Sequence, residues 1–446
     1  MESVGGEGVG SSSSITKVAT ASFIGSAIEW YDFFLYGTAA ALVFPALFFP
    51  GFSALAGTLA AFATFGVAFV ARPIGGVVFG HYGDKVGRKA MLVVTLLIMG
   101  LATFFIGLLP SFETIGVLAP ILLVLLRFAQ GFGVGGEWGG AALMAVEHAP
   151  PGRRGFYGSW PQLGIPAGLL LSTAVFSAVS ALPDEQFLTW GWRIPFLLSI
   201  VLVGVGLFIR LKIMETPSFS RVKETHTEAR MPILDVLSAY PRAVLLAAGA
   251  RFADNVLYYV FATFVLTYTT SQLGLPRSVA LIGVLIASGL ELVTMPAFGS
   301  LSDRVGRRPV IVGGAIAMML LSFPFFWLVD TGNTLLIWLA IVLALAVSHA
   351  AVFGPIAAFF AELFDTRVRY SGTSVGFQLG AVVAGGPTPF IATALLVWSG
   401  GDPWPISLFA FAAGLVTLVS VLLAAETFRT DLEEEKPRER EGVATS

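Results

Sequence analysis

Twelve long apolar runs constrain this chain more than any other feature of its sequence. Each run has about 20 residues or more, which is the length that a helix needs to cross about 30 Å of hydrocarbon. The runs cover residues 19–45, 55–81, 90–109, 117–146, 157–180, 191–212, 242–270, 278–300, 309–329, 334–361, 371–399 and 404–426. In lipid every backbone N–H and C=O needs a partner inside the protein, and the runs lack the alternating polarity of barrel strands. We therefore predict an all-α polytopic membrane protein with twelve transmembrane helices.

The composition agrees with this class and narrows the chemistry. Hydrophobic residues make up 56% of the chain and charged residues only 12%, whereas about a quarter of the residues of a soluble domain are charged. The chain has no cysteine, which excludes disulfides, iron–sulfur clusters and a thiol nucleophile. Neither the phosphate-binding pattern G-x-x-x-x-G-K-[ST] nor the zinc pattern H-E-x-x-H occurs in it. We expect no enzyme activity, no cofactor, no metal and no nucleic-acid partner.

A long polar connection at 213–241 divides the chain into two halves that repeat each other. "GHYGDKVGRK" (80–89) and "GSLSDRVGRR" (299–308) match at an offset of 219 residues, and Asp32 aligns with Asp254 at an offset of 222. Parallel repeats pack as two pseudo-symmetric six-helix bundles, with the ligand site between them near the middle of the membrane. The predicted segments are an N-terminal tail (1–18), a first bundle (19–212), a linker (213–241), a second bundle (242–426) and a C-terminal tail (427–446).

The basic residues predict the orientation in the membrane. With the N-terminus inside, the cytoplasmic connections contain pairs such as Arg153 and Arg154 or Arg367 and Arg369, and the outer connections contain mainly acidic or neutral residues. Cytoplasmic loops of membrane proteins carry such an excess of Lys and Arg. We expect a monomer in the plasma (inner) membrane, in contact with the lipid bilayer and with both termini in the cytoplasm.

The two loops of the form G-x-x-x-D-[KR]-x-G-R-[KR] resemble the signature of the major facilitator superfamily. Four further segments are similar to the metabolite:H+ symporter family within it: "EWYDFFLYG", "RFAQGFGVGGEWGGA", "GFYGSWPQLG" and "GWRIPFLLS". The resemblance covers the chain apart from its two tails. It implies the superfamily's twelve-helix fold and the transport of dicarboxylates, tricarboxylates, 2-oxoglutarate, shikimate or zwitterions such as proline and betaine. The motifs leave the choice among these substrates open.

The first span carries two acids on one helical stripe. Glu29, Asp32 and Tyr36 follow one another at spacings of three and four residues, so they share a face. Each ionised carboxylate in hydrocarbon costs about 2.5–3.5 kcal/mol on insertion scales, so these acids need a partner or an aqueous cavity. We expect Glu29 and Asp32 to couple protons to transport and Tyr36 to bind substrate. The alternative is a structural ion pair with Arg72 of the second span.

The seventh span repeats this design. Arg251, Asp254, Asn255 and Tyr258 lie on one face at i, i+3, i+4 and i+7. Arg251 and Asp254 are close enough along the helix to neutralise each other, so we assign both a structural role. Asn255 and Tyr258 remain as uncharged groups that could bind the substrate.

Further candidates lie in the fourth, eighth, tenth and eleventh spans. Arg127 is near the middle of the membrane, and its planar guanidinium suits a substrate carboxylate; the alternative is that it balances an acid. We expect Gln130 and Gln378 to bind substrate as well. His349 can change its charge near neutral pH, so it is a third candidate for proton coupling, or else a packing residue. Glu291 could balance Arg251.

The remaining charges suggest a gate. Asp84 and Asp303 of the two signature loops could cap helix starts, and the arginines could bridge to acids at neighbouring cytoplasmic ends. In the superfamily that the loops resemble, this network latches the outward-open state; the alternative is that the basic loops only fix topology. The residues assigned to gating or structure are Arg72, Asp84, Arg88, Glu137, Glu147, Arg154, Arg251, Asp254, Asp303, Arg307, Glu362 and Arg369.

Together these features predict a secondary active transporter. We expect proton-coupled uptake of a small organic acid or zwitterionic metabolite by alternating access, with the metabolite and H+ as its partners. The alternative is a proton-coupled exporter on the same fold. The order of residues in "GSWPQLGIPAG" differs from the glycine–proline motif G-x-x-x-G-P-x-x-G-G of exporters in the superfamily, which favours uptake.

Overall fold

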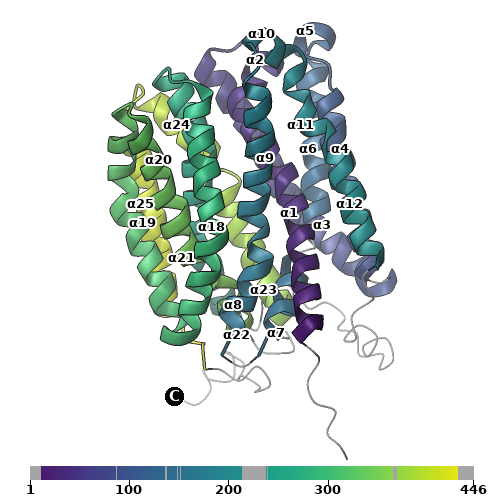
Figure 1. Cartoon of the computed structure of the whole chain (residues 1–446), viewed down its shortest axis with the longest axis vertical. Helices are drawn as coiled ribbons and strands as arrows, with labels where there is room; N and C mark the ends of the chain where they lie inside the picture. Colours follow the sequence, from purple (N-terminus) through teal and green to yellow (C-terminus); the bar gives the residue numbers. More distant parts are fainter. Residues whose placement is uncertain are drawn as a thin grey trace, which may run out of the picture.

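A computed structural model of the chain describes residues 12–86, 88–135, 138–147, 149–150, 152–212, 238, 240–364 and 369–429 (Figure 1). The side chains of Asp84 and Arg88, the whole of Glu137 and most of the predicted linker lie outside the described residues. The predictions that concern them therefore stay predictions.

Helices make up the described part of the first half. They are α1 (Ser12–Leu42), α2 (Phe44–Phe48), α3 (Ala54–Val86), α4 (Arg88–Leu108), α5 (Phe112–Ile115), α6 (Leu118–Val134), α7 (Trp138–Glu147), α8 (Arg154–Gln162), α9 (Gly164–Ser180), α10 (Asp184–Gln186), the π-helical η1 (Phe187–Gly191), α11 (Arg193–Leu197) and α12 (Ser199–Lys212).

The second half has the same character, with four further π-helical segments. Its elements are α15 (Pro241–Ala250), α16 (Phe252–Tyr258), η2 (Tyr259–Phe264), α17 (Val265–Thr267), η3 (Tyr268–Gln272), α18 (Arg277–Val305), α19 (Arg307–Asp330), α20 (Thr334–Val342), η4 (Leu343–His349), α21 (Ala350–Phe353), α22 (Ile356–Leu363), α23 (Arg369–Gly380), η5 (Ala381–Gly385), α24 (Thr388–Trp398) and α25 (Trp404–Leu423).

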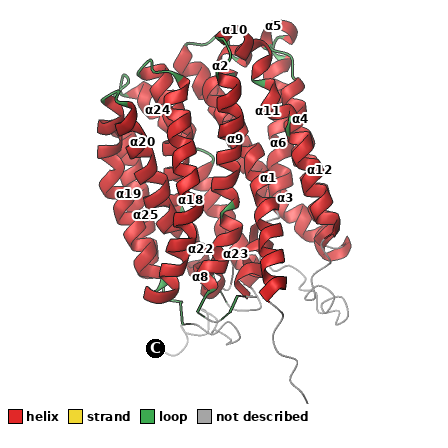
Figure 2. Cartoon of the chain, viewed as in Figure 1, coloured by secondary structure: helices red, strands yellow, loops and turns green. Residues whose placement is uncertain are grey.

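These elements form twelve membrane spans, as predicted. Within the described residues, nine helical stretches are long and apolar enough to cross a membrane, and Val93–Leu108 and Leu118–Val134 are shorter apolar helices. The long helix α1, which holds the first predicted span, completes the twelve. Figure 2 shows helices joined by short connections, and no strand occurs in the part of the chain that is described.

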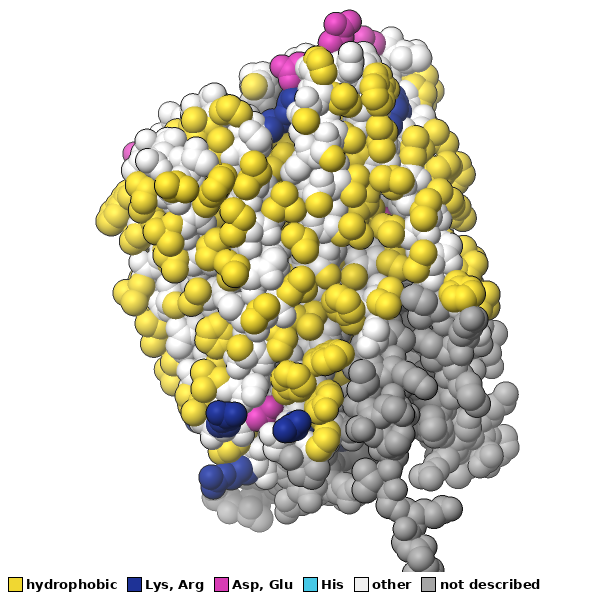
Figure 3. Space-filling model, in the orientation of Figure 1, with side chains coloured by type: hydrophobic (Ala, Val, Ile, Leu, Met, Phe, Trp, Pro, Cys, Tyr) yellow, Lys and Arg dark blue, Asp and Glu magenta, His cyan; other side chains and the backbone are white. Residues whose placement is uncertain are grey.

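The helices run side by side along the long axis of the molecule, with the two halves next to each other (Figure 1). We call the end that carries α10 the α10 end and the opposite end, near α8 and α22, the α8 end. The chain enters α1 and leaves α25 at the α8 end. The halves meet where α18 packs on α8 and α9 and where α24 packs on α3. Figure 3 shows a flank covered by hydrophobic side chains, with charged side chains toward the two ends, as a bilayer requires.

The glycines of the fourth span serve close packing. A methyl group at Gly131 would overlap the backbone of Ala68, and one at Gly135 would overlap the carbonyl oxygen of Arg72. Helices α3 and α6 therefore touch backbone to backbone, which is the usual function of small residues between membrane helices. This contact holds together the two helices that carry the buried residues Arg72 (α3) and Arg127 (α6).

Candidate functional site

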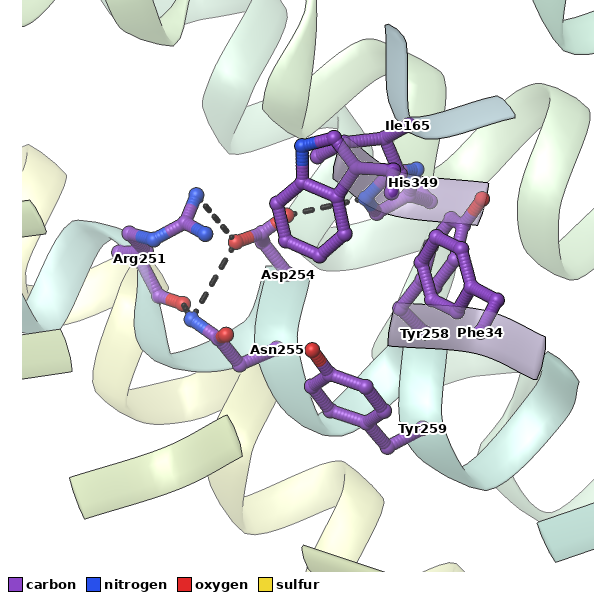
Figure 4. Close-up of a pocket in the computed structure, with 9 residues that line it drawn as sticks. Phe34, Ile165, Arg251, Asp254, Asn255, Tyr258, Tyr259 and His349 are labelled. Carbon is purple, nitrogen blue, oxygen red and sulfur yellow. Dashed lines mark hydrogen bonds and ion pairs between the residues drawn. The ribbon is translucent and has the colours of Figure 1, made fainter. Parts of the chain in front are cut away.

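A small cavity is lined by residues of both halves (Figure 4). It has room for about one water molecule, and contacts at both ends of the molecule, described below, hold the halves together in this closed form. The residues that line it come from α1, α9, the seventh span and η4: Trp30, Phe34, Ile165, Arg251, Asp254, Asn255, Tyr258, Tyr259 and His349.

One wall of the cavity is a chain of ionisable groups. Nη1 of Arg251 lies 2.9 Å from Oδ2 of Asp254, and Oδ1 of the same carboxylate lies 2.9 Å from Nε2 of His349. Nδ1 of His349 contacts Oε1 of Glu291. None of the four side chains is more than 4% exposed. An imidazole between two carboxylates can bind a proton and pass it from one acid to the other.

This arrangement corrects one expectation. Glu291 does not balance Arg251, because it pairs with His349 instead, and Asp254 is the acid beside Arg251. The i, i+3 spacing within the seventh span already brings Asp254 to Arg251, and α18 places Glu291 against η4. The predicted pairing between Arg251 and Asp254 is present in the structure.

The uncharged groups of the seventh span are also at the cavity, as Figure 4 shows. Nδ2 of Asn255 donates to the carbonyl oxygen of Arg251 at 2.9 Å and to Asp254 at 3.3 Å. The ring of Tyr258 packs on His349, with centroids 4.5 Å apart, and on Phe34 at 5.2 Å. Its hydroxyl has no hydrogen-bond partner among the described residues. The carboxyl group of Glu291 faces this hydroxyl, so a ligand in an enlarged cavity would meet it as part of the ionisable wall.

The acids of α1 lie beside the cavity rather than in its lining. Asp32 is 1% exposed, and neither of its carboxylate oxygens has a hydrogen-bond partner in the described part of the chain. Thr103 of α4 faces it, but that hydroxyl donates to the carbonyl oxygen of Met99 at 3.0 Å. Glu29 is within electrostatic reach of Arg72, which favours the ion pair considered for it. Asp32 has no such compensation.

Arg127 occupies an aromatic box in the first half. Its guanidinium lies 4.4 Å from the ring centre of Phe33, 4.2 Å from that of Tyr36 and 4.7 Å from that of Phe65. It donates to Oε1 of Gln130 at 3.0 Å, while its Nη2 has no partner among the described residues. The side chain is fully buried and does not line the cavity.

Three predicted substrate ligands form hydrogen bonds between helices instead. Nε2 of Gln130 donates to Thr103 at 2.6 Å, and the hydroxyls of Tyr36 and Thr64 are 2.6 Å apart. Gln378 of α23 donates to the carbonyl oxygen of Gly135 at 3.2 Å, across the interface between the halves. Of the predicted ligands, only Asn255 and Tyr258 line the cavity of this closed form.

Between the cavity and the α8 end, aromatic rings close the interface. Trp138 of the first half stacks on Phe377 of the second half, with ring centroids 3.5 Å apart. The guanidinium of Arg251 lies on the same Phe377 ring, 3.4 Å from its centre. Nε1 of Trp138 donates to Gln162 at 2.8 Å. The cation at the cavity is thus in direct contact with the ring that joins the halves below it.

At the α8 end, charged residues of the gating prediction meet across the halves. Asp303 accepts hydrogen bonds from the backbone N–H groups of Gly155 and Phe156 at 2.8 and 2.9 Å, which cap the start of α8. Arg307 lies 2.7 Å from Asp303 and 3.0 Å from Glu362. Arg369 reaches Glu147 at 3.3 Å. We call these five charged residues the α8-end network; Arg154, at the start of α8, is beside it.

The α10 end has a different kind of contact. Arg277 of the second half lies 2.7 Å from Asp184 of the first, and the side chains are 24% and 81% exposed. No sequence pattern pointed to this pair, because each residue is an ordinary charge in an outer connection. Nor did any pattern single out Trp30, Phe34 and Tyr259, since aromatic residues are common in every span. Among the described residues, no cluster of His, Asp and Glu side chains is placed to hold a metal ion.

Comparison with known proteins shows the family and the fold. The profile of the Major Facilitator Superfamily matches residues 22–386. The shikimate transporter of Escherichia coli (strain K12) is 45% identical over 426 residues, which is 95% of this chain and 97% of that protein. The glycine betaine/proline/ectoine/pipecolic acid transporter OusA of Dickeya dadantii (strain 3937) is 38% identical over 433 residues, 95% of this chain and 86% of that protein.

A solved structure has the same architecture. The proton:xylose symporter XylE bound to 6-bromo-6-deoxy-D-glucose superposes with a TM-score of 0.72 over 95% of this chain and 98% of that one. The two sequences are 18% identical, so the likeness is one of fold alone.

Proposed function

The chain belongs to the Major Facilitator Superfamily and is a multi-pass membrane transporter rather than an enzyme, and on that premise we propose that it takes up a small organic acid together with protons. The observation that carries the proposal is the buried chain of Asp254, His349 and Glu291 at a cavity between the halves. Ionisable groups inside a membrane bundle are expensive and mark ion pathways. Asp32, buried without a hydrogen-bond partner in the described part, supports a second place for a proton.

A carboxylate is the favoured cargo. Two buried arginines, Arg251 in the lining of the cavity and Arg72 within electrostatic reach of it, can offset the charge of an anion, and the similar E. coli protein is named a shikimate transporter. A zwitterion is the second choice, because the similar protein of Dickeya is named for betaine and proline. In both cases the carboxylate is the common group.

Alternating access accounts for the contacts at the two ends. The α8-end network joins the halves while the cavity is reached from the α10 end, and it breaks when the halves rock the other way. The role of Asp303 in this latch is supported by its hydrogen bonds to α8 of the first half, and Arg307 and Glu362 are buried beside it within the second half. The roles of Asp84 and Arg88 are supported by the sequence repeat alone. The basic residues at the α8 end favour its placement in the cytoplasm.

Gradient-driven uptake tests the proposal. Proteoliposomes with an inwardly directed proton gradient should accumulate labelled shikimate, and a protonophore should abolish the accumulation. Labelled glycine betaine in a parallel sample distinguishes an anion carrier from a zwitterion carrier. Accumulation that continues unchanged in the presence of the protonophore would show that uptake is not coupled to protons. Accumulation only under an outwardly directed gradient would favour the exporter.

A further inference from the structure

Arg251 is placed to bind the carboxylate of a ligand, but in this form a carboxylate of the protein itself, that of Asp254, is paired with it. Among the residues that line the cavity it is the one guanidinium. Its acidic partner is Asp254, at 2.9 Å, and its Nε has no hydrogen-bond partner in the described part of the chain. A carboxylate of the protein thus forms the ion pair that a carboxylate of a ligand could form with Arg251 in its place.

The same carboxylate is the one that can receive a proton. Oδ1 of Asp254 is 2.9 Å from Nε2 of His349, whose other nitrogen contacts Glu291. A proton on Asp254 removes the charge that holds Arg251. Because an arginine stays charged over the physiological range, it then needs another anion. Protonation of one residue and the need for an anion at the next are therefore linked by geometry.

On the premise of the proposed function, we propose that Arg251 is the anchor for the carboxylate of the substrate, and that Asp254 competes with the substrate for it until Asp254 is protonated through His349. The substrate would lie between Arg251, Asn255 and Tyr258, under the rings of Trp30 and Phe34. Symport follows directly. Protonation of Asp254 frees Arg251 to bind the anion, and an anion bound to Arg251 favours the protonated form of Asp254.

The proton transfer is balanced within the chain of three residues. A proton that arrives on Glu291 passes to Nδ1 of His349, and the proton on Nε2 passes to Oδ1 of Asp254. Glu291 returns to its carboxylate form, the imidazole is again neutral, and Asp254 is a neutral acid. One proton has been taken up, and the positive charge of Arg251 is released to the ligand.

The neighbouring charges fit this assignment. Besides Asp254, the groups that face Arg251 are Tyr259 of η2 and Arg72 of α3. The groups that face His349 and Glu291 are Asp254 and, for Glu291, Tyr258. Arg127 was the predicted anchor, but it is enclosed by Phe33, Tyr36 and Phe65 and does not reach the cavity.

Equilibrium binding tests the proposal with labelled shikimate and purified protein, from about pH 5.5 to about pH 8.5. Throughout this range a free carboxylic acid with an ordinary pKa of about 4 stays ionised. Since binding takes up a proton, wild-type affinity should rise as the pH falls, by as much as about tenfold per unit. In Asp254→Asn the competitor is gone, so affinity should be independent of pH and should exceed that of the wild type at high pH.

The arginines provide matched variants. Arg251→Gln should weaken shikimate binding by about 30-fold or more at every pH, whereas Arg127→Gln should change it by only about threefold or less. Because Asp254→Asn leaves Arg251 without its partner, the double variant Arg251→Gln/Asp254→Asn serves as a charge-balanced check. It should fold, as judged by thermal unfolding, and should bind shikimate weakly and without pH dependence.

Several outcomes would overturn the proposal. They are an Asp254→Asn variant that is stable yet as pH-dependent as the wild type, normal binding by Arg251→Gln, and a loss of binding in Arg127→Gln instead. Wild-type protein that binds no shikimate would overturn it too. If wild-type proteoliposomes still show proton-driven uptake in any of these cases, the proposed function stands and only the assignment of Arg251 fails.

Discussion

Asp32 combines two properties that conflict in a bilayer: it is an acid, and it is buried without a hydrogen-bond partner in the described part of the chain. An ionised form would be costly there, so we expect the residue to be protonated in this closed form and to ionise when the halves open. Asp32→Asn keeps the shape and removes the titration. Proton-driven accumulation in proteoliposomes should fall by at least about tenfold, a change of about 1.4 kcal/mol.

The fold should tolerate this change, because no partner of Asp32 is lost. The midpoint of thermal unfolding should stay within a few degrees of the wild-type value. Glu113→Gln, on the exposed helix α5, removes a carboxylate of no expected function and is the matched control. Full gradient-driven accumulation by Asp32→Asn would show that the proton travels elsewhere.

Tyr258 and Tyr31 form a natural pair for separating binding from stability. The hydroxyl of Tyr258 is at the cavity and faces Glu291 without forming a hydrogen bond of good geometry among the described residues, whereas that of Tyr31 donates to the carbonyl oxygen of Pro195 at 2.7 Å. Tyr258→Phe should raise the KM for transport about fivefold with no loss of stability, since a hydrogen bond contributes about 1 kcal/mol. Tyr31→Phe should do the reverse. Uptake assays and thermal unfolding of both variants check this, and an unchanged KM in Tyr258→Phe would remove the hydroxyl from the site.

At this scale the sequence predicted the members of the site better than their contacts. Intramembrane acids, arginines and a histidine are conspicuous in apolar spans, so Asp254 and His349 stand out from the sequence alone. Their union with Glu291 was not predictable, because it joins positions 58 and 95 residues apart on three separate elements. Arg127 was predicted to bind the substrate, but it does not line the cavity, and the three rings that surround its guanidinium come from tertiary packing.

Among the elements, the breaks in the long spans are the feature that periodicity does not reveal. Tyr259 begins the π-helical segment η2, and His349 ends η4. Single-turn π segments often occur at functional sites, and both of these residues line the cavity. The apolar runs predicted the positions of all twelve spans, since length and hydropathy suffice for that. A local change in hydrogen-bond pitch depends on the neighbouring helices instead.

Helices α8 and α18 approach each other closely at the α8 end. A side chain at Gly299 would collide with the backbone of Gly155 on the other half. Gly299→Val should therefore hold the α8 end apart and reduce transport severely. Since the chain has no cysteine, spin labels can be placed on Arg153→Cys and Arg304→Cys alone, and the distance between them should increase.

Gly289 of the same helix offers the control, because a methyl group there would meet no atom within 4 Å. Gly289→Val should leave both the label distance and transport close to the values of the unsubstituted chain. An unchanged distance in Gly299→Val would mean that the neighbouring helices absorb the larger side chain without opening.

For the whole molecule, the informative feature is that the halves touch at both ends around a cavity of about one water molecule. Such a form is an intermediate between two open states, so a ligand must enter by breaking one end. A second label pair at the α10 end, Glu185→Cys with Ser278→Cys, should report the opposite movement from the first pair. Distances that lengthen together at both ends on addition of substrate would contradict the rocking of rigid halves.

The contacts that join the halves at the two ends of the molecule differ in their exposure to solvent. The side chains of Arg277 and Asp184 are 24% and 81% exposed. At the α8 end, Asp303 binds the backbone of α8 across the halves and its side chain is only 5% exposed, while Glu147 of the pair with Arg369 is 45% exposed. Dissolved ions screen exposed charges, with a Debye length of about 10 Å at 0.1 M and about 3 Å at 1 M. Raising the ionic strength should therefore weaken the contact at the α10 end more than the contacts at the α8 end. The ratio of the form that is open at the α10 end to the closed form should rise by up to about fivefold, because an exposed ion pair contributes about 1 kcal/mol. In the orientation proposed above, with the α8 end in the cytoplasm, the salinity outside the cell would then help to set how often this protein presents its cavity to the medium.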